Sequence, residues 1–263
     1  MEDLLPSIGA WTLTGARLLG LTLAIPFFSG RILAFRFRLV LSAILAGPLS
    51  MSLPADWNAP YPSEAGFPEA AALIALEVLT GFALGWSARL VLEAVRGAGM
   101  FISDQIGFSL GGALDPHLAP PEPALRALHG AFAIHVFFSL DFHHACLRAV
   151  SESVRALPPG SIGSLETVER AGRTLIASGS GLFEAALTAA FPLTAALLLA
   201  ALAQGIAARV FPRFEVFLFG FPTRAVLGLG VVALTLPYLA TCSAAFYSAA
   251  GALGSTFLQA LGG

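Results

Sequence analysis

Residues Glu184 to Gly205 read "EAALTAAFPLTAALLLAALAQG", a run built almost entirely from alanine and leucine. A helix needs about 20 predominantly apolar residues to cross the hydrocarbon core of a bilayer. A helix that is apolar on every side and rich in small residues is typical of one surrounded by other helices. The run therefore predicts an all-α membrane protein in which helices pack closely against one another.

The composition of the whole chain agrees with this class. Of the 263 residues, 57% are hydrophobic and only 11% are charged, and the mean hydropathy is +0.81. Soluble domains carry about 25% charged residues. A net charge of −2 gives no basic surface for a nucleic acid, so we expect a membrane environment and no nucleic-acid partner.

Six apolar segments are candidate helices, and the stretches between them leave no room for a soluble domain. We therefore treat residues 1–263 as one membrane domain, with kinks expected at Pro192 and Pro237. The six segments are residues 7–28, 39–53, 69–92, 124–147, 182–208 and 225–253.

Arginine counts in the presumed loops favour an orientation with both chain ends outside, because cytoplasmic loops carry the excess of basic residues. The fourth loop is an exception, since it places four arginines on the predicted outer side. A chain whose helices do not all cross the bilayer would explain this exception. The four residues are Arg148, Arg155, Arg170 and Arg173.

Four charged residues fall in or next to apolar segments: Arg17, Glu77, Asp141 and Glu184. A charge at the centre of a membrane helix costs about 2.5–3.5 kcal/mol, so such residues usually face protein or a water-filled cavity. Two interpretations are open, a proton or ion relay and structural pairs buried between helices. No cluster of carboxylates supports the relay, and we expect sister subunits to shelter these charges.

Small residues indicate where helices approach closely. "GFALG" (Gly81 to Gly85) and "GFSLG" (Gly107 to Gly111) both place glycines four positions apart. Such small-xxx-small stretches allow two backbones to come into contact. With only six apolar segments of its own, the chain is expected to need partner subunits around it.

The sequence contains no motif that supports catalysis or a metal site. His143 and His144 lie near Asp141, but adjacent residues of a helix are expected to project to different sides. We interpret these residues as polar contacts near a helix end. We therefore expect no enzymatic activity, no cofactor and no metal.

Three stretches together resemble one family. They are "GMFISDQIGFSLGGALDP" (Gly99 to Pro116), "DFHHACLRAVSESVRALPPGS" (Asp141 to Ser161) and "ARVFPRFEVFLFGFP" (Ala208 to Pro222). Their order and content resemble the family of the flagellar biosynthetic protein FliR and its injectisome counterparts, membrane subunits of the type III protein export gate. The resemblance covers nearly the full length, and the C-terminal stretch looks more like the flagellar branch. The injectisome branch and, outside the family, a secondary transporter remain alternatives.

The chain departs from the family pattern in the third stretch. Arg213 and Glu215 stand where the family usually has Gln and Asn, and Thr223 and Arg224 stand where it has Leu and Lys. The polar contacts of this segment therefore cannot be carried over from the family.

The resemblance implies a channel assembled with FliP-like and FliQ-like membrane subunits, in contact with FlhB-like and FlhA-like export subunits, in the bacterial inner membrane. Unfolded proteins would pass through its centre, and much of the assembly would be raised out of the bilayer plane. It also implies that Ser103 to Pro116 forms part of the plug that closes the channel. The plug residues would be Gln105, Gly107, Phe108, Ser109, Gly111 and Gly112.

Physical chemistry is consistent with such a plug, because glycines free the backbone to rearrange and hydrophobic constrictions gate by dewetting. For the third stretch, we expect a turn bracketed by Pro212 and Pro222, with its aromatic side chains inserted into neighbouring subunits. A loop whose aromatics lie on lipid is the alternative. The aromatic residues are Phe214, Phe217, Phe219 and Phe221.

Overall fold

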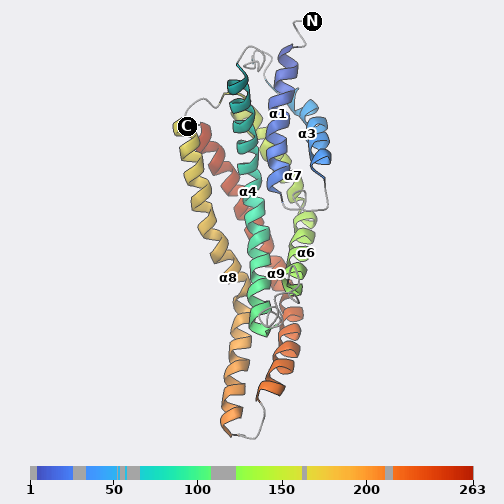
Figure 1. Ribbon diagram of the computed structural model, residues 1–263, viewed down its shortest axis with the longest axis vertical. Helices are drawn as coiled ribbons and strands as arrows, with labels where there is room; N and C mark the ends of the chain where they lie inside the picture. Colours follow the sequence, from blue (N-terminus) through green and yellow to red (C-terminus); the bar gives the residue numbers. More distant parts are fainter. Residues whose placement is uncertain are drawn as a thin grey trace. The chain divides into compact units, whose positions relative to one another are not determined.

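The computed structural model describes residues 5–25, 34–51, 53, 57, 66–107, 123–161, 165–210 and 216–262 (Figure 1). Within these ranges the chain forms seven helices and no strand, which confirms the predicted all-α membrane fold. The helices are α1 (Leu5–Ala24), α3 (Phe35–Ser50), α4 (Phe67–Ile106), α6 (Ala124–Ser139), α7 (Phe142–Ala156), α8 (Leu165–Val210) and α9 (Val216–Gly262).

The long helices extend well beyond the apolar segments that predicted them. Helix α4 has 40 residues, α8 has 46 and α9 has 47. The prolines at 192 and 237 lie inside helices that continue on both sides. An apolar run measures how much of a helix suits lipid, whereas the helix itself continues until a residue or a contact ends it.

The segment predicted at 124–147 is not one helix. It divides into α6 and α7 at Leu140 and Asp141, and Asp141 has a left-handed backbone with φ of 52°. Because a continuous α-helix requires right-handed dihedrals throughout, this single residue ends the run. The apolar character of the segment did not predict the break between α6 and α7.

The arginines that were counted as loop residues lie mostly in helices. Of the four arginines in the predicted fourth loop, Arg148 and Arg155 belong to α7, and Arg170 and Arg173 belong to α8. The expectation of a long fourth loop rich in arginine is therefore wrong. The orientation derived from these counts stays a prediction.

Three described helical stretches are long and apolar enough to cross a membrane: Phe67–Ile106, Leu187–Val210 and Pro222–Ala249. Among the described residues, the other predicted segments give shorter helices or fall below this hydropathy. The chain is thus a membrane protein, and three of its described helices have the length and composition of a membrane span.

The chain divides into two compact units, and three helices contribute residues to both. Unit 1 contains Met1–Leu90, Asp141–Ser180 and Tyr247–Gly263, and unit 2 contains Val91–Leu140 and Gly181–Phe246. In unit 1, α1 lies beside α3 (Figure 1), and the Trp11 indole N–H donates a hydrogen bond to the Ala43 carbonyl over 2.9 Å. This contact joins the two N-terminal helices of unit 1.

The core of unit 2 is apolar. Two clusters each join α4, α6, α8 and α9. The first lies around Leu92 to Ala98 of α4, and the second lies at the C-terminal end of α4. The first contains Leu92, Val95, Ala98, Ala133, Ala189, Ala190 and Leu239, and the second contains Ile102, Ile106, Leu125, Leu197 and Val232. The C-terminal part of α4 stays helical because these side chains are buried there, although it is less apolar than its first part.

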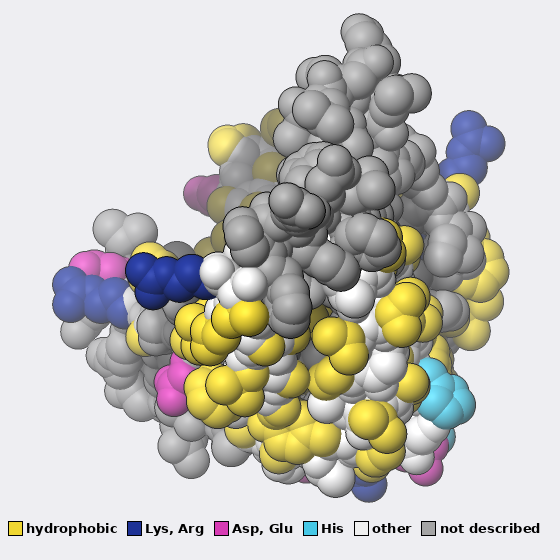
Figure 2. All heavy atoms as spheres, turned by 90° about the horizontal axis from the view of Figure 1, so that it is seen from below, with side chains coloured by type: hydrophobic (Ala, Val, Ile, Leu, Met, Phe, Trp, Pro, Cys, Tyr) yellow, Lys and Arg dark blue, Asp and Glu magenta, His cyan; other side chains and the backbone are white. Residues whose placement is uncertain are grey.

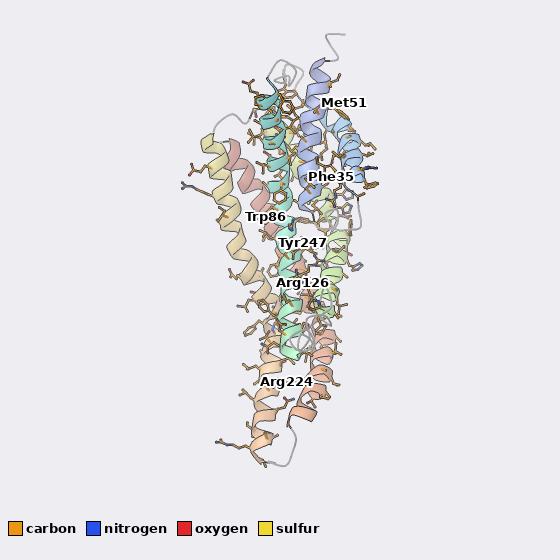
Figure 3. All side chains as sticks on the ribbon, in the orientation of Figure 1. Phe35, Met51, Trp86, Arg126, Arg224 and Tyr247 are labelled. Atoms are coloured by element: carbon orange, nitrogen blue, oxygen red, sulfur yellow. The ribbon has the colours of Figure 1, made fainter. Side chains whose placement is uncertain are left out.

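Large apolar side chains also lie on the outside of the helices. Figure 2 shows hydrophobic side chains over much of the described part of the face it draws, and Figure 3 marks Phe35 and Met51 at the two ends of α3. An exposed apolar surface of this extent is typical of contact with lipid or with other subunits. On α8 it includes Leu198, Leu199, Leu202, Ile206 and Val210, and on α9 it includes Val226 and Leu234.

Candidate functional site

Two of the four charged residues found in the sequence form a buried ion pair in unit 1. The Arg17 guanidinium Nε on α1 donates to Glu77 Oε2 on α4 over 2.7 Å. The side chains are 0% and 1% exposed. The charges therefore compensate each other where water cannot reach them, which is the condition that makes a buried charge tolerable.

Further groups of the same chain bind both members of this pair, although Arg17 Nη2 is buried and has no hydrogen-bond partner among the described residues. Arg17 Nη1 donates to the Ser153 hydroxyl over 3.2 Å and to the Leu157 carbonyl over 3.0 Å. On the other side, the Gly160 amide donates to Glu77 Oε1 over 2.8 Å. The pair thus ties together four segments: α1, α4, α7 and the residues that follow α7. The expectation that sister subunits shelter these two charges is wrong, because this chain supplies the shelter itself.

Glycines bring the two helices close enough to close the pair. A Cβ atom at Gly81 would overlap the Arg17 carbonyl oxygen, and one at Gly20 would overlap the Val78 carbonyl oxygen. A Cβ atom at Gly85 would lie 2.7 Å from the Ala24 methyl group. The close approach expected for "GFALG" is confirmed, and it places backbone against backbone directly beside the ion pair.

The sequence alone did not identify the partners of the pair. Ser153, Leu157 and Gly160 are all part of the second stretch that carries the family resemblance, but its content suggested no link to Arg17. One local signal was available in the sequence, because Gly160 directly follows two prolines. In the structure Gly160 has φ of 85°, a conformation that glycine adopts without steric cost. A glycine after two prolines indicates a tight turn, but it does not say which carboxylate its amide will reach.

The other two charged residues are placed differently. Glu184 is exposed on α8, and Asp141 is exposed at the start of α7. The described partners of the buried pair come from α7 and the residues after it. The geometry therefore supports a structural pair buried between helices, rather than a proton or ion relay, for Arg17 and Glu77.

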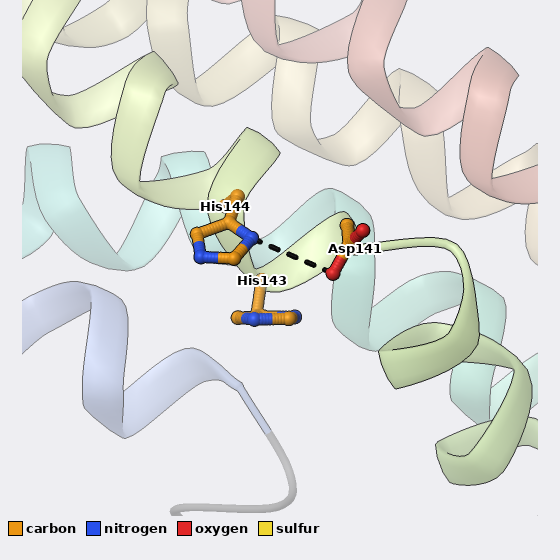
Figure 4. Close-up of side chains that lie close together, drawn as sticks. All are labelled: Asp141, His143 and His144. Carbon is orange, nitrogen blue, oxygen red and sulfur yellow. Dashed lines mark ion pairs between the residues drawn. The ribbon is translucent and has the colours of Figure 1, made fainter.

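Asp141 lies close to the two adjacent histidines (Figure 4). His144 Nδ1 is 3.5 Å from Asp141 Oδ1, and the ring centroids of His143 and His144 are only 4.1 Å apart. The expectation that the two rings project to different sides is wrong. Both residues lie in the first turn of α7, where no preceding helical turn restricts their side-chain rotamers.

The candidate plug begins at the end of α4. Gln105 is exposed there, and Gly107 ends the helix with φ of 94° while its amide donates to the Ser103 and Asp104 carbonyls, each over 3.1 Å. The remaining predicted plug residues lie outside the described residues. They are Phe108, Ser109, Gly111 and Gly112.

The end of α4, where the predicted plug segment starts, is held in unit 2. Ile106 is buried in the second apolar cluster, and Gly228 of α9 accommodates it, because a Cβ atom at Gly228 would overlap the Ile106 side chain. The described start of the predicted plug segment therefore contains an anchored residue.

The aromatic segment is largely helical. Helix α9 begins at Val216 and continues through Pro222, so the expected turn between Pro212 and Pro222 is wrong from Val216 onward. Pro222 lies inside this helix, where it removes one backbone hydrogen bond without ending the helix. Phe214 and the side chains of Phe217, Phe219 and Phe221 lie outside what the structure describes.

Two of the residues that depart from the family pattern, Thr223 and Arg224, join α8 to α9 in unit 2, whereas Arg213 and Glu215 lie outside the described residues. Gln204 donates from Nε2 to the Thr223 hydroxyl, and Arg224 donates from Nε to Gln204 Oε1, both over 3.1 Å; Figure 3 marks Arg224. The side-chain amide of Gln204 therefore has a partner for its nitrogen in Thr223 and a partner for its oxygen in Arg224.

The sequence of the chain matches one protein family over most of its length. The model of the family described as bacterial export proteins, family 1, matches residues 8–249. The chain belongs to this family. The matched range of this chain includes both residues of the buried pair and the described residues of the candidate plug.

Individual relatives point in the same direction. The chain is 30% identical to the flagellar biosynthetic protein FliR of Escherichia coli over 85% of its own length and 83% of that protein. It is 28% identical to FliR of Pectobacterium carotovorum over 85% of the chain and 82% of the relative. It is also 25% identical to the secretion system apparatus protein SsaT of Salmonella typhimurium, over 63% of each chain.

Proposed function

We propose that this chain is a non-enzymatic membrane subunit of the flagellar type III protein export gate. With FliP-like and FliQ-like subunits it forms the channel through which unfolded flagellar proteins leave the cell, next to FlhB-like and FlhA-like export subunits. It is a multi-pass protein of the bacterial inner membrane. The observation that carries this proposal is the similarity to FliR proteins over 85% of the chain.

The geometry of the buried pair favours this function over a secondary transporter. A carboxylate of a proton relay or a solute site lies on a pathway that protons or the solute can reach, such as a water-filled cavity. Both oxygens of Glu77 accept hydrogen bonds from this chain, and its side chain is almost completely buried. Arg17 and Glu77 are therefore proposed to hold the helices of unit 1 together.

An injectisome export subunit is the second candidate. It is supported by the match to SsaT, which is less similar and covers a smaller part of the chain than the two FliR matches do. The two functions share the same class of export gate and differ in the substrates that pass through it.

The proposal can be tested by expressing a tagged version of this chain in its own bacterium and by deleting its gene. We expect it to co-purify from membranes with FliP-like and FliQ-like subunits, and we expect its deletion to abolish the flagellar filament. Loss of effector secretion with intact filaments would assign the injectisome instead. Purification as a partner-free chain that transports a small solute in liposomes would contradict both.

The plug remains a proposal, comprising Gln105, Gly107, Phe108, Ser109, Gly111 and Gly112. It is supported by the positive φ of Gly107 and by the anchored Ile106 that precedes it. We expect Gly107→Val to change ion leakage or export without preventing assembly, because a β-branched residue does not fit this backbone. Gly107→Asn is the matched control, since Asn adopts positive φ more readily, and equal export and leakage in both variants and the wild type would refute the plug.

A further inference from the structure

Asp141 has two features that its position at the start of a helix does not explain. It is the one non-glycine residue with positive φ among those the structure describes. It occupies the N-cap position of α7, yet its side chain makes no capping hydrogen bond. An aspartate at an N-cap ordinarily accepts a hydrogen bond from a backbone amide of the first turn. The carboxylate is instead directed toward the imidazole of His144 (Figure 4).

The distance between these two groups is long for an ion pair. His144 Nδ1 and Asp141 Oδ1 are 3.5 Å apart. A charge-assisted hydrogen bond between nitrogen and oxygen has a length of about 2.7–2.9 Å. Two ligands at about 2.1 Å from a tetrahedral metal ion, by contrast, are separated by roughly 3.4 Å. The observed separation is close to the second value.

His143 brings a third ligand to the same place. One ligand atom from each of Asp141, His143 and His144 lies within 4.8 Å of the others. Asp141 and His144 are 72% and 62% exposed. Side chains this accessible can move the short distance that a common coordination sphere requires, and an ion can reach them from solvent.

We propose that Asp141, His143 and His144 form a binding site for a divalent transition-metal ion of the zinc class. Two imidazoles and one carboxylate are the ligand types that Zn²⁺ prefers, and hard ions such as Mg²⁺ favour oxygen ligands instead. Three protein ligands leave one tetrahedral position for water, as in an open zinc site. The site lies wholly within unit 1 and goes beyond the proposed export function, because a bound ion would hold the first turn of α7 and the left-handed residue before it.

Zinc binding to the purified full-length chain, together with any subunits that co-purify, tests this site. We expect one Zn²⁺ per chain in a competition titration with a chromophoric chelator, and a tetrahedral visible spectrum when Co²⁺ replaces Zn²⁺. Even the loss of a residue that only orients a ligand costs about 10–100-fold in metal affinity. Asp141→Asn and His144→Gln are therefore each expected to weaken Zn²⁺ binding by at least 10-fold.

The matched control is His135→Gln, which removes another exposed histidine that is not part of the cluster. It should leave Zn²⁺ affinity and the Co²⁺ spectrum unchanged. Asp141→Gly separates folding from binding, because glycine tolerates the observed φ while it removes the carboxylate. Helix content should be retained in this variant and metal affinity should fall. The proposal is overturned if the double variant His143→Gln/His144→Gln binds Zn²⁺ as the wild type does, or if His135→Gln loses as much affinity as His144→Gln.

Discussion

Two of the ion pairs in the described part of unit 1, Arg17–Glu77 and Asp141–His144, have surroundings that differ in almost every respect. Arg17 and Glu77 lie 2.7 Å apart, are buried, and have further hydrogen bonds to Ser153, Leu157 and Gly160. Asp141 and His144 lie 3.5 Å apart and are mostly exposed. Ion pairs of the first kind hold a fold together because losing one partner leaves a charge that water cannot reach, whereas water screens pairs of the second kind. The same chemistry thus serves structure in one place and leaves its groups available to a ligand in the other.

The largest effect should follow from breaking the buried pair. Glu77→Ala leaves the Arg17 guanidinium buried without its counter-charge, which typically costs about 3–5 kcal/mol of stability. We expect a large fall in the unfolding temperature of the detergent-solubilised chain and a smaller amount of folded protein in the membrane.

Replacing both members of the pair shows whether charge is the cause. The double variant Arg17→Met/Glu77→Leu removes both charges and keeps apolar volume, so it should be considerably more stable than Glu77→Ala. A double variant that unfolds as readily as the single variant would mean that the helices depend on another feature of this site.

The close helix approach beside the pair should give the next largest effect. Gly81→Ala forces a methyl group into the Arg17 carbonyl, and overpacking of this kind costs about 1–3 kcal/mol. Gly47→Ala is the matched control in α3, because a Cβ atom there meets nothing within 4 Å. The control should be neutral or stabilise the chain by about 0.5–1 kcal/mol, since alanine favours helices over glycine. Equal thermal shifts in the two variants would contradict the close approach.

A smaller effect is expected at the edge of the buried pair. Ser153→Ala removes one acceptor of Arg17 Nη1 and leaves the Leu157 carbonyl in place. The loss should be about 1 kcal/mol, the usual net contribution of one hydrogen bond. Chemical denaturation of the solubilised chain measures it, and a loss as large as that of Glu77→Ala would show that Ser153 matters for more than this bond.

The exposed pair should give the smallest effect on stability. With a chelator present, Asp141→Asn should change the free energy of unfolding by no more than about 0.5–1 kcal/mol, because exposed ion pairs contribute little and Asn also tolerates left-handed dihedrals. Thermal unfolding at low and high salt checks this. A loss of several kcal/mol would remove the contrast between the two pairs.

The apolar segments predicted which parts of the chain are helical but not where the helices end. The segment at 69–92 became a helix that continues to Ile106, since side chains such as Val95 and Ile102 are buried in the core of unit 2. The segment at 124–147 was divided by Asp141 alone. Hydropathy describes the preference of a residue for water or lipid and contains no information on a single backbone dihedral.

The candidate sites show the same limit. Arg17 and Glu77 were recognisable as costly charges from their apolar neighbours, and "GFALG" correctly indicated a close helix approach. The nearness of the two histidine rings was not predictable, because it depends on rotamers in the first turn of α7. The contacts of Thr223 and Arg224 were equally hidden, since both residues depart from the family pattern.

The sequence by itself determined that this is a helical membrane protein of an export family, because composition and the order of its motifs are properties of the chain alone. Only the tertiary structure decided that Arg17 meets Glu77, 60 positions away, and that Gly160 reaches the same carboxylate from 83 positions away. Contacts between helices depend on how each helix is rotated and shifted against its neighbour. Glycines such as Gly81 set that distance through the space that a missing Cβ atom leaves, and the effect exists only once both helices are in place.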